Sequence, residues 1–172
     1  MKKILILLLF VSKIFASFGF ITSFEADFTQ SVTDEKNKVL KYRGSVSALK
    51  PQKAIWNYTN PVKKDIFINT YCIVMIEPEI EQVIIKNIKS NFDFFNIIKN
   101  AKKINKDYFL AKYKKLRFFI TTKNDLIKSI SYKDEFDNKV KIIFKNQKQN
   151  GKINPKIFIP KIPKGFDVIK DF

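Results

Sequence analysis

The sequence of 172 residues contains no histidine and only four glycines, and both scarcities exclude classes of function. Without histidine the chain lacks the usual general base, the usual zinc ligand and every Ser-His or Cys-His nucleophile arrangement. The four glycines are scattered, so the sequence has no glycine-rich phosphate loop. The acids on either side of Pro78 (Glu77, Glu79 and Glu81) are typical of a solvated turn. The sequence therefore predicts a protein that is not an enzyme and that holds no metal or cofactor.

Cysteine is also scarce, because Cys72 is the only one. A single thiol excludes an internal disulfide. Cys72 lies in an apolar run, which favours a buried strand residue over a reactive thiol. No cysteine stands just after the amino-terminal segment, so we expect no lipid anchor there.

Arginine is scarce within a strongly basic composition. Lys and Arg together number 33 against 16 Asp and Glu, a formal net charge of +17, yet only Arg43 and Arg117 are arginines. Phosphate and base recognition favour the planar arginine fork, and the lysines are spread over the whole chain. The composition therefore argues against nucleic acid as a partner. A weak attraction to anionic lipid headgroups is compatible with it.

The chain has one notable apolar run, near its start. Met1-Lys2-Lys3 is followed by apolar residues from Ile4 to Val11 and then by a small residue, Ala16. The run is shorter than the roughly 20 residues that span a bilayer. This order predicts a secretory signal peptide over residues 1–16 and a single domain over 17–172; the alternative is an uncleaved anchor. Removal of the three signal lysines leaves 30 − 16 = +14.

Most of the remaining chain alternates between apolar and polar residues, the period of a strand with one buried face. Residues 17–23 leave room for only a short helical turn. Polar hairpin turns are expected at 34–38, 124–125 and 137–138, with further turns at 60–61, 69–70 and 150–151. Strands are predicted over 24–32, 40–48, 54–58, 65–76, 82–86, 107–113, 116–121, 126–132, 140–144 and, last, between Pro155 and Pro160.

Residues 91–99 have a different period. Phe92, Phe95 and Ile98 form a helical stripe, and Ser90 or Asn91 can cap its start. Many antiparallel hairpins with one helix inserted midway favour a mainly β fold with an α cover. We expect an incomplete, open antiparallel β-barrel whose short helices form a lid over its concave face.

Several spaced motifs together resemble a known family. They are Ser23-Phe24-Glu25-Ala26-Asp27-Phe28-Thr29-Gln30, Gly44, Pro51 with Trp56, Tyr58 and Pro61, Pro78 with Glu81-Gln82, and Pro163-Lys164-Gly165-Phe166-Asp167-Val168-Ile169. This ordered set resembles the outer-membrane lipoprotein carrier family, LolA, over nearly the whole mature chain. The resemblance implies an unclosed barrel with an apolar cavity that takes lipoprotein acyl chains.

The resemblance also implies partners and a location. A carrier of this family is a periplasmic protein, here expected as a monomer. It is loaded by an inner-membrane lipoprotein-releasing ABC transporter and unloads to an outer-membrane lipoprotein receptor of the same fold. The receptor is itself lipid-anchored, and the absence of an anchoring cysteine favours the carrier here. Two alternatives stay open: a periplasmic binder of another lipid or glycolipid on the same scaffold, and a basic surface module without a cavity.

The resemblance further suggests site residues. Lys50 takes the position of a family arginine linked to lid closure and transfer, and we hypothesise that it bonds carbonyls or polar groups of the cover in the closed state. For each cavity candidate, ordinary core packing is the competing interpretation. The lipid-cavity candidates are Ala54, Trp56, Tyr58, Phe67, Phe92, Phe95, Ile98, Phe118 and Phe144.

Overall fold

The computed structural model describes residues 18–87 and 94–171. The predicted signal peptide (1–16), the helix-capping candidates Ser90 and Asn91, and the cavity candidate Phe92 lie outside these residues. The helical segments are η1 (Phe18–Phe20), η2 (Pro78–Ile80), α1 (Phe94–Lys99) and η3 (Pro155–Phe158). The strands are β1 (Ser23–Thr33), β2 (Val39–Leu49), β3 (Lys53–Asn60), β4 (Lys64–Ile68), β5 (Cys72–Glu77), β6 (Gln82–Asn87), β7 (Lys102–Asn105), β8 (Tyr108–Tyr113), β9 (Leu116–Lys123), β10 (Leu126–Lys133), β11 (Lys139–Gln149) and β12 (Asp167–Asp171).

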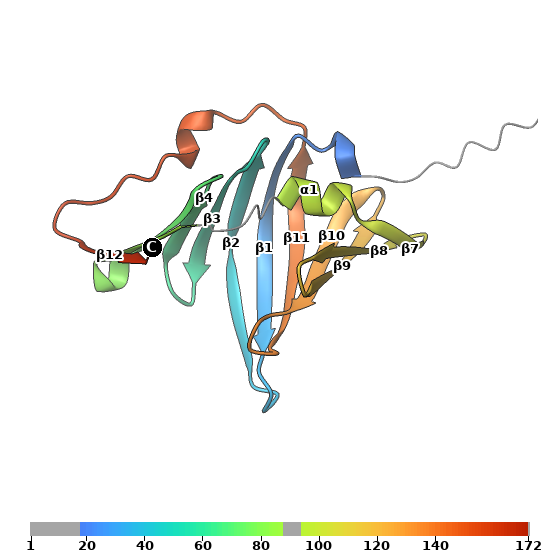
Figure 1. Ribbon diagram of the computed structural model, residues 1–172, viewed down its shortest axis with the longest axis horizontal. Helices are drawn as coiled ribbons and strands as arrows, with labels where there is room; N and C mark the ends of the chain where they lie inside the picture. Colours follow the sequence, from blue (N-terminus) through green and yellow to red (C-terminus); the bar gives the residue numbers. More distant parts are fainter. Residues whose placement is uncertain (1–17, 88–93, 172) are drawn as a thin grey trace, which may run out of the picture.

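The strands form one sheet in the order β12-β6-β5-β4-β3-β2-β1-β11-β10-β9-β8-β7. Every neighbouring pair is antiparallel except β12 and β6, which are parallel. The edge strands β12 and β7 do not pair with each other, so the sheet curves without closing, and α1 lies over it near β1, β11 and β10 (Figure 1). This confirms the predicted open β-barrel with a short helical cover. Within the described ranges, no helix has the length and apolarity needed to cross a bilayer.

Two hydrophobic clusters occupy opposite faces of the sheet. The larger one, on the face that we call the pocket face, joins α1 and η1 to the inward residues of β1, β2 and β8–β11. The smaller one lies on the outer face of β3–β6, where Phe158 of η3 packs with Ile55, Phe67 and Val74. Residues 150–166 run from the end of β11 across to the far edge of the sheet, where β12 pairs (Figure 1). The outer face of β3 and β4 is therefore covered, whereas their inner face is turned to the pocket side.

Three segments differ from the sequence-based expectation. The strand expected between Pro155 and Pro160 is wrong, because η3 forms there. Asn154 caps η3 by accepting a hydrogen bond from the Lys156 amide (3.0 Å), and Pro155 occupies the first turn, where a proline costs no hydrogen bond. Strands β7 and β12 were not predicted, because their residues are exposed and show no buried alternation.

Two five-residue turns, starting at Asp34 and Asp134, join β1 to β2 and β10 to β11. Each aspartate accepts a hydrogen bond from the backbone amide four residues later, at 2.8 and 2.9 Å. Asn37 and Asp137 take left-handed conformations (φ of 61° and 60°), which short polar residues tolerate well. These turns confirm the predicted hairpins and fix the register of the two strand pairs that they join.

Gly44 is the position in the sheet that tolerates a side chain least. A Cβ built there would lie 1.9 Å from the backbone oxygen of Asn57 on β3 and 3.0 Å from the Phe28 ring. Gly44→Ala must therefore push β2 and β3 apart, and overpacking of this kind costs about 1–3 kcal/mol. We expect a clear drop in the thermal unfolding midpoint, measured by circular dichroism. Gly151→Ala is the matched control, since nothing lies within 4 Å of its Cβ position; equal midpoints for the two variants would contradict the prediction.

Candidate functional site: an apolar pocket beneath α1

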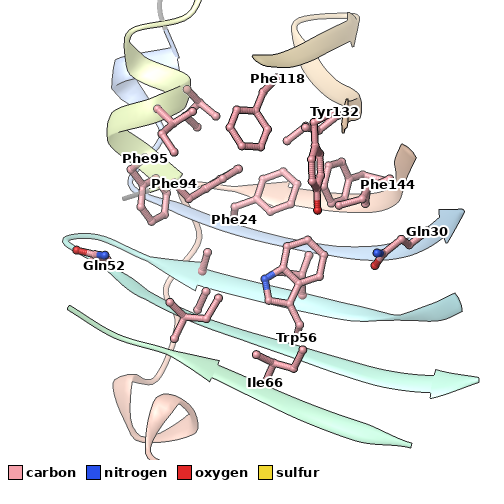
Figure 2. Close-up of a pocket in the computed structure, with 18 of the residues that line it drawn as sticks. Phe24, Gln30, Gln52, Trp56, Ile66, Phe94, Phe95, Phe118, Tyr132 and Phe144 are labelled. Carbon is pink, nitrogen blue, oxygen red and sulfur yellow. The ribbon is translucent and has the colours of Figure 1, made fainter. Parts of the chain in front are cut away.

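An apolar pocket of about 330 Å³ lies on the pocket face, between α1 and the sheet (Figure 2). Its walls come from β1–β4, from β9–β11 and from α1, so residues far apart in the sequence share one space. Apart from Gln30, Gln52, Lys53 and two tyrosines, its lining is apolar. The described residues contain no group of three potential metal ligands. The arrangement suits an apolar ligand.

Most of the residues named from the sequence meet in this pocket. Phe92 lies outside the described residues. The prediction that Phe67 lines the cavity is wrong, because Phe67 packs in the outer cluster. Phe67 pairs with Ile55 across β3 and β4, whereas its neighbours Ile66 and Ile68 line the pocket. The segment 65–76 is apolar on both faces, so the sequence did not show which of its residues turn to the pocket, and Phe67 was assigned to the wrong face. The candidates that do line the pocket are Ala54, Trp56, Tyr58, Phe95, Ile98, Phe118 and Phe144.

Aromatic rings form a continuous floor from β3 to α1. Phe28 contacts the Trp56 ring edge-on, with 5.0 Å between centroids, and Trp56 lies 6.4 Å from Phe144. Phe144 in turn meets Phe24 at 5.2 Å, and Phe24 lies 6.5 Å from Phe94 at the start of α1. Edge-to-face packing leaves ring faces and edges available to an apolar ligand. Phe24 was not predicted as a lining residue, although the alternation along β1 places it on the same face as Phe28.

Among the described residues, the cover over this floor consists of the six residues of α1 and the three residues of η1, which contact each other. Phe95 and Ile98 point from α1 into the cluster and are 2% and 1% exposed. Phe18 of η1 packs edge-on against Phe109 of β8, with 4.9 Å between ring centroids. Apolar contacts thus hold the described part of the cover against the sheet.

Lys50 contacts both parts of this cover. Its Nζ donates a hydrogen bond to the carbonyl oxygen of Gly19 in η1 (2.9 Å) and lies 5.7 Å from the ring centroid of Phe95 in α1. The backbone amide of Lys50 donates to the Thr22 carbonyl (2.9 Å), which anchors the residue at the end of the sheet. The ammonium therefore binds a cover carbonyl, as hypothesised from the sequence. Its role in transfer stays a prediction.

Polar groups gather at the end of the pocket away from α1. The Tyr58 hydroxyl donates to Oε1 of Gln30 (2.8 Å), and Nζ of Lys64 lies 5.0 Å from the centroid of the Tyr58 ring. Burial raises the pKa of both Tyr58 and Tyr132 above the ordinary value for a phenol, so both hydroxyls stay protonated at neutral pH. Gln30 and Tyr132 also line the pocket and were not predicted from the sequence.

Comparison with known proteins agrees with this geometry. Residues 20–123 match the family model described as "Outer membrane lipoprotein carrier protein LolA". A protein of Campylobacter jejuni named outer-membrane lipoprotein carrier protein is 38% identical over 169 residues, covering 98% of this chain and 99% of that protein. A protein of the same name from Helicobacter hepaticus is 31% identical over 151 residues, covering 87% and 84% of the two chains.

A solved structure supports the fold alone. The crystal structure of an uncharacterised conserved protein from Thermus thermophilus superposes with a TM-score of 0.53 at 12% identity, covering 89% of this chain and 93% of that one. The family match and the near full-length relatives are decisive for membership. The chain belongs to the outer-membrane lipoprotein carrier protein family, LolA.

Proposed function

We propose that this protein is a periplasmic chaperone that encloses the acyl chains of lipoproteins in the pocket beneath α1. On this proposal an inner-membrane lipoprotein-releasing ABC transporter loads the protein, and an outer-membrane receptor accepts the cargo. The protein acts as a monomer, and residues 1–16 are its cleaved secretory signal. The observation that carries the proposal is an apolar pocket under a short cover in a chain of the lipoprotein carrier family.

Physical chemistry explains why such a carrier is needed. Burial of an acyl chain is worth about 0.8 kcal/mol per CH₂ group, so a lipid anchor with several long chains does not cross water unshielded. The pocket of about 330 Å³ is near the lower end of the range for ligand sites, roughly 300–1,000 Å³. Loading of a long chain therefore requires the cover to move. A helix of six residues is too short to be stable alone in water and can move once its packing is exchanged for packing on the ligand.

The nature of the cargo can be tested directly. Protein purified from periplasm and analysed by mass spectrometry should carry peptides with an acylated amino-terminal cysteine. Recovery of phospholipid or glycolipid in their place would contradict the proposal and would support a binder of another lipid on the same scaffold. A protein that carries no lipid at all would favour a basic surface module.

Phe95→Glu should separate ligand binding from folding. It places a carboxylate in the acyl site, where a bound chain would remove the charge from water at a high cost, so binding of a fluorescent long-chain fatty acid should fall by about tenfold or more. The Lys50 ammonium, 5.7 Å from the Phe95 ring, can pair with the new carboxylate and keep the cover folded. We therefore expect cooperative thermal unfolding but little binding.

The matched control for this variant is Phe136→Glu. Phe136 is 72% exposed in the turn between β10 and β11, so the same substitution there should leave folding and binding unchanged. A Phe95→Glu protein that does not fold would indicate that Phe95 is ordinary close-packed core. A folded protein with normal binding would remove Phe95 from the site.

Lys50→Leu should slow the release of cargo. The variant loses a charge-assisted hydrogen bond to the Gly19 carbonyl, an interaction worth about 1.5–3 kcal/mol, which stabilises the empty, closed state. The loaded form becomes relatively more stable, so transfer to a purified receptor should slow by about tenfold or more. Lys50→Arg keeps a donor and should be tolerated. Lys41→Leu, at an exposed position on β2, is the control for lost charge, and equal transfer rates for wild type and Lys50→Leu would show that this lysine has no part in release.

A further inference from the structure

Two polar side chains in the apolar pocket, Gln30 and Tyr132, have hydrogen-bond donors without a partner among the described residues. Gln30 accepts the Tyr58 hydroxyl at Oε1, but its Nε2 bonds to no residue that the structure describes. Tyr132 packs against Phe118, with 5.1 Å between ring centroids, and its hydroxyl likewise has no hydrogen-bond partner among the described residues. Both residues line the pocket, and Figure 2 shows their polar ends directed into it.

The geometry of Gln30 is held by the protein. The hydrogen bond from Tyr58 (2.8 Å) occupies the amide oxygen and so leaves the two N–H groups of Nε2 for another acceptor. Tyr58 is itself fixed by edge-on contact with Phe28 (5.0 Å between centroids) and by the Lys64 ammonium over its ring. Tyr58 and Gln30, which belong to two different motifs, thus together orient the Gln30 Nε2 donor.

These donors lie at the end of the pocket away from α1. Phe24 is beside α1, whereas Gln30 is six residues further along β1, which corresponds to roughly 20 Å. Tyr132 lies on β10 two residues beyond the level of Gln30, because Gln30 pairs with Ile142 and Tyr132 pairs with the next inward residue of β11, Val140. Gln52 and Lys53 line the pocket at its other end, near the start of β3. An acyl ligand whose polar head lies near Gln30 and Tyr132 has its chain ends toward α1.

The head of an ester-linked acyl chain is a carbonyl group, which only accepts hydrogen bonds. Burial of such a carbonyl without a donor is unfavourable, and the two unused donors in this pocket match that need. Resting on the proposed function, we propose that Gln30 Nε2 and the Tyr132 hydroxyl donate hydrogen bonds to the ester carbonyls of the bound diacylglyceryl group. The pocket then recognises acyl esters and not merely apolar chains. The raised pKa of Tyr132, caused mainly by burial, is consistent with a protonated donor.

The test compares two ligands with the same apolar chains. One is a fluorescent peptide with a dipalmitoylglyceryl cysteine, and the other is its dihexadecyl ether counterpart, which lacks both ester carbonyls. Wild-type protein should bind the diester about 5–30-fold more tightly than the diether, as expected for two hydrogen bonds. Tyr132→Phe should weaken diester binding by roughly 3–10-fold and leave diether binding unchanged.

Two further variants complete the test. Gln30→Leu combined with Tyr58→Phe removes the Gln30 donor together with its partner, so that no hydroxyl is left unpaired; it should also weaken only the diester. Tyr71→Phe, at a tyrosine that is 80% exposed, is the matched control and should change neither affinity. Thermal unfolding of each variant reports whether it remains folded.

The outcomes distinguish the two proposals. If wild-type protein binds the diester and the diether equally, carbonyl recognition is wrong, while acyl-chain binding stands. If Tyr132→Phe and the double variant weaken both ligands equally, the residues shape the pocket and carbonyl recognition is again wrong. If wild-type protein binds neither ligand, the proposed carrier function fails and this inference fails with it.

Discussion

A curved sheet whose apolar inner face needs a cover is the constraint on which the rest of this structure depends. Strands β1–β4 and β8–β11 present this face, and α1 and η1 are the described elements that lie over it. A sheet face of this kind must be buried against something. Between the sheet and α1 a pocket of about 330 Å³ remains. On the proposed function this pocket is the binding site, and a ligand completes its packing.

The two halves of the sheet bury their apolar residues on different faces. In β3–β6 the outer face is covered by residues 150–166, with Phe158 seated on Phe67 and Val74. Rigid support from behind allows the inner residues Trp56 and Ile66 to face a partly empty space without loss of strand order. The wall opposite α1 is therefore built on the part of the sheet whose outer face is packed. On the proposed function, movement is left to the cover.

The sequence predicted those elements that bury one face. Strands β1 to β6 and β8 to β11 were all found, because burial on one side leaves an alternation that can be read locally. Strands β7 and β12 could not be found in this way, since all their residues are exposed and only pairing with a neighbour orders them. The segment after Asn154 was misassigned, although an asparagine before a proline is a recognisable start of a helical turn.

The site was predicted less completely than the fold, for a physical reason. Alternation states that Ile66 and Phe67 point to opposite faces but not which face holds the pocket. That choice depends on the register of β4 against β3, in which Ile66 lies opposite Trp56. Polar residues were missed for a different reason. Gln30 and Tyr132 look unsuited to an apolar cavity until their position at one end of it is known.

A carrier must bind its cargo strongly enough to cross water and weakly enough to release it, and the pocket separates these two requirements in space. On the proposed function, affinity comes mainly from apolar contact along the aromatic floor, which scales with buried chain length. Release then depends on the stability of the empty state, in which Lys50 joins the Gly19 carbonyl and the Phe95 ring. A change at one end therefore need not alter the other. The donors proposed at the far end, beside Gln30, are a third element, since they bear on what kind of acyl chain is held rather than on how tightly the cover closes.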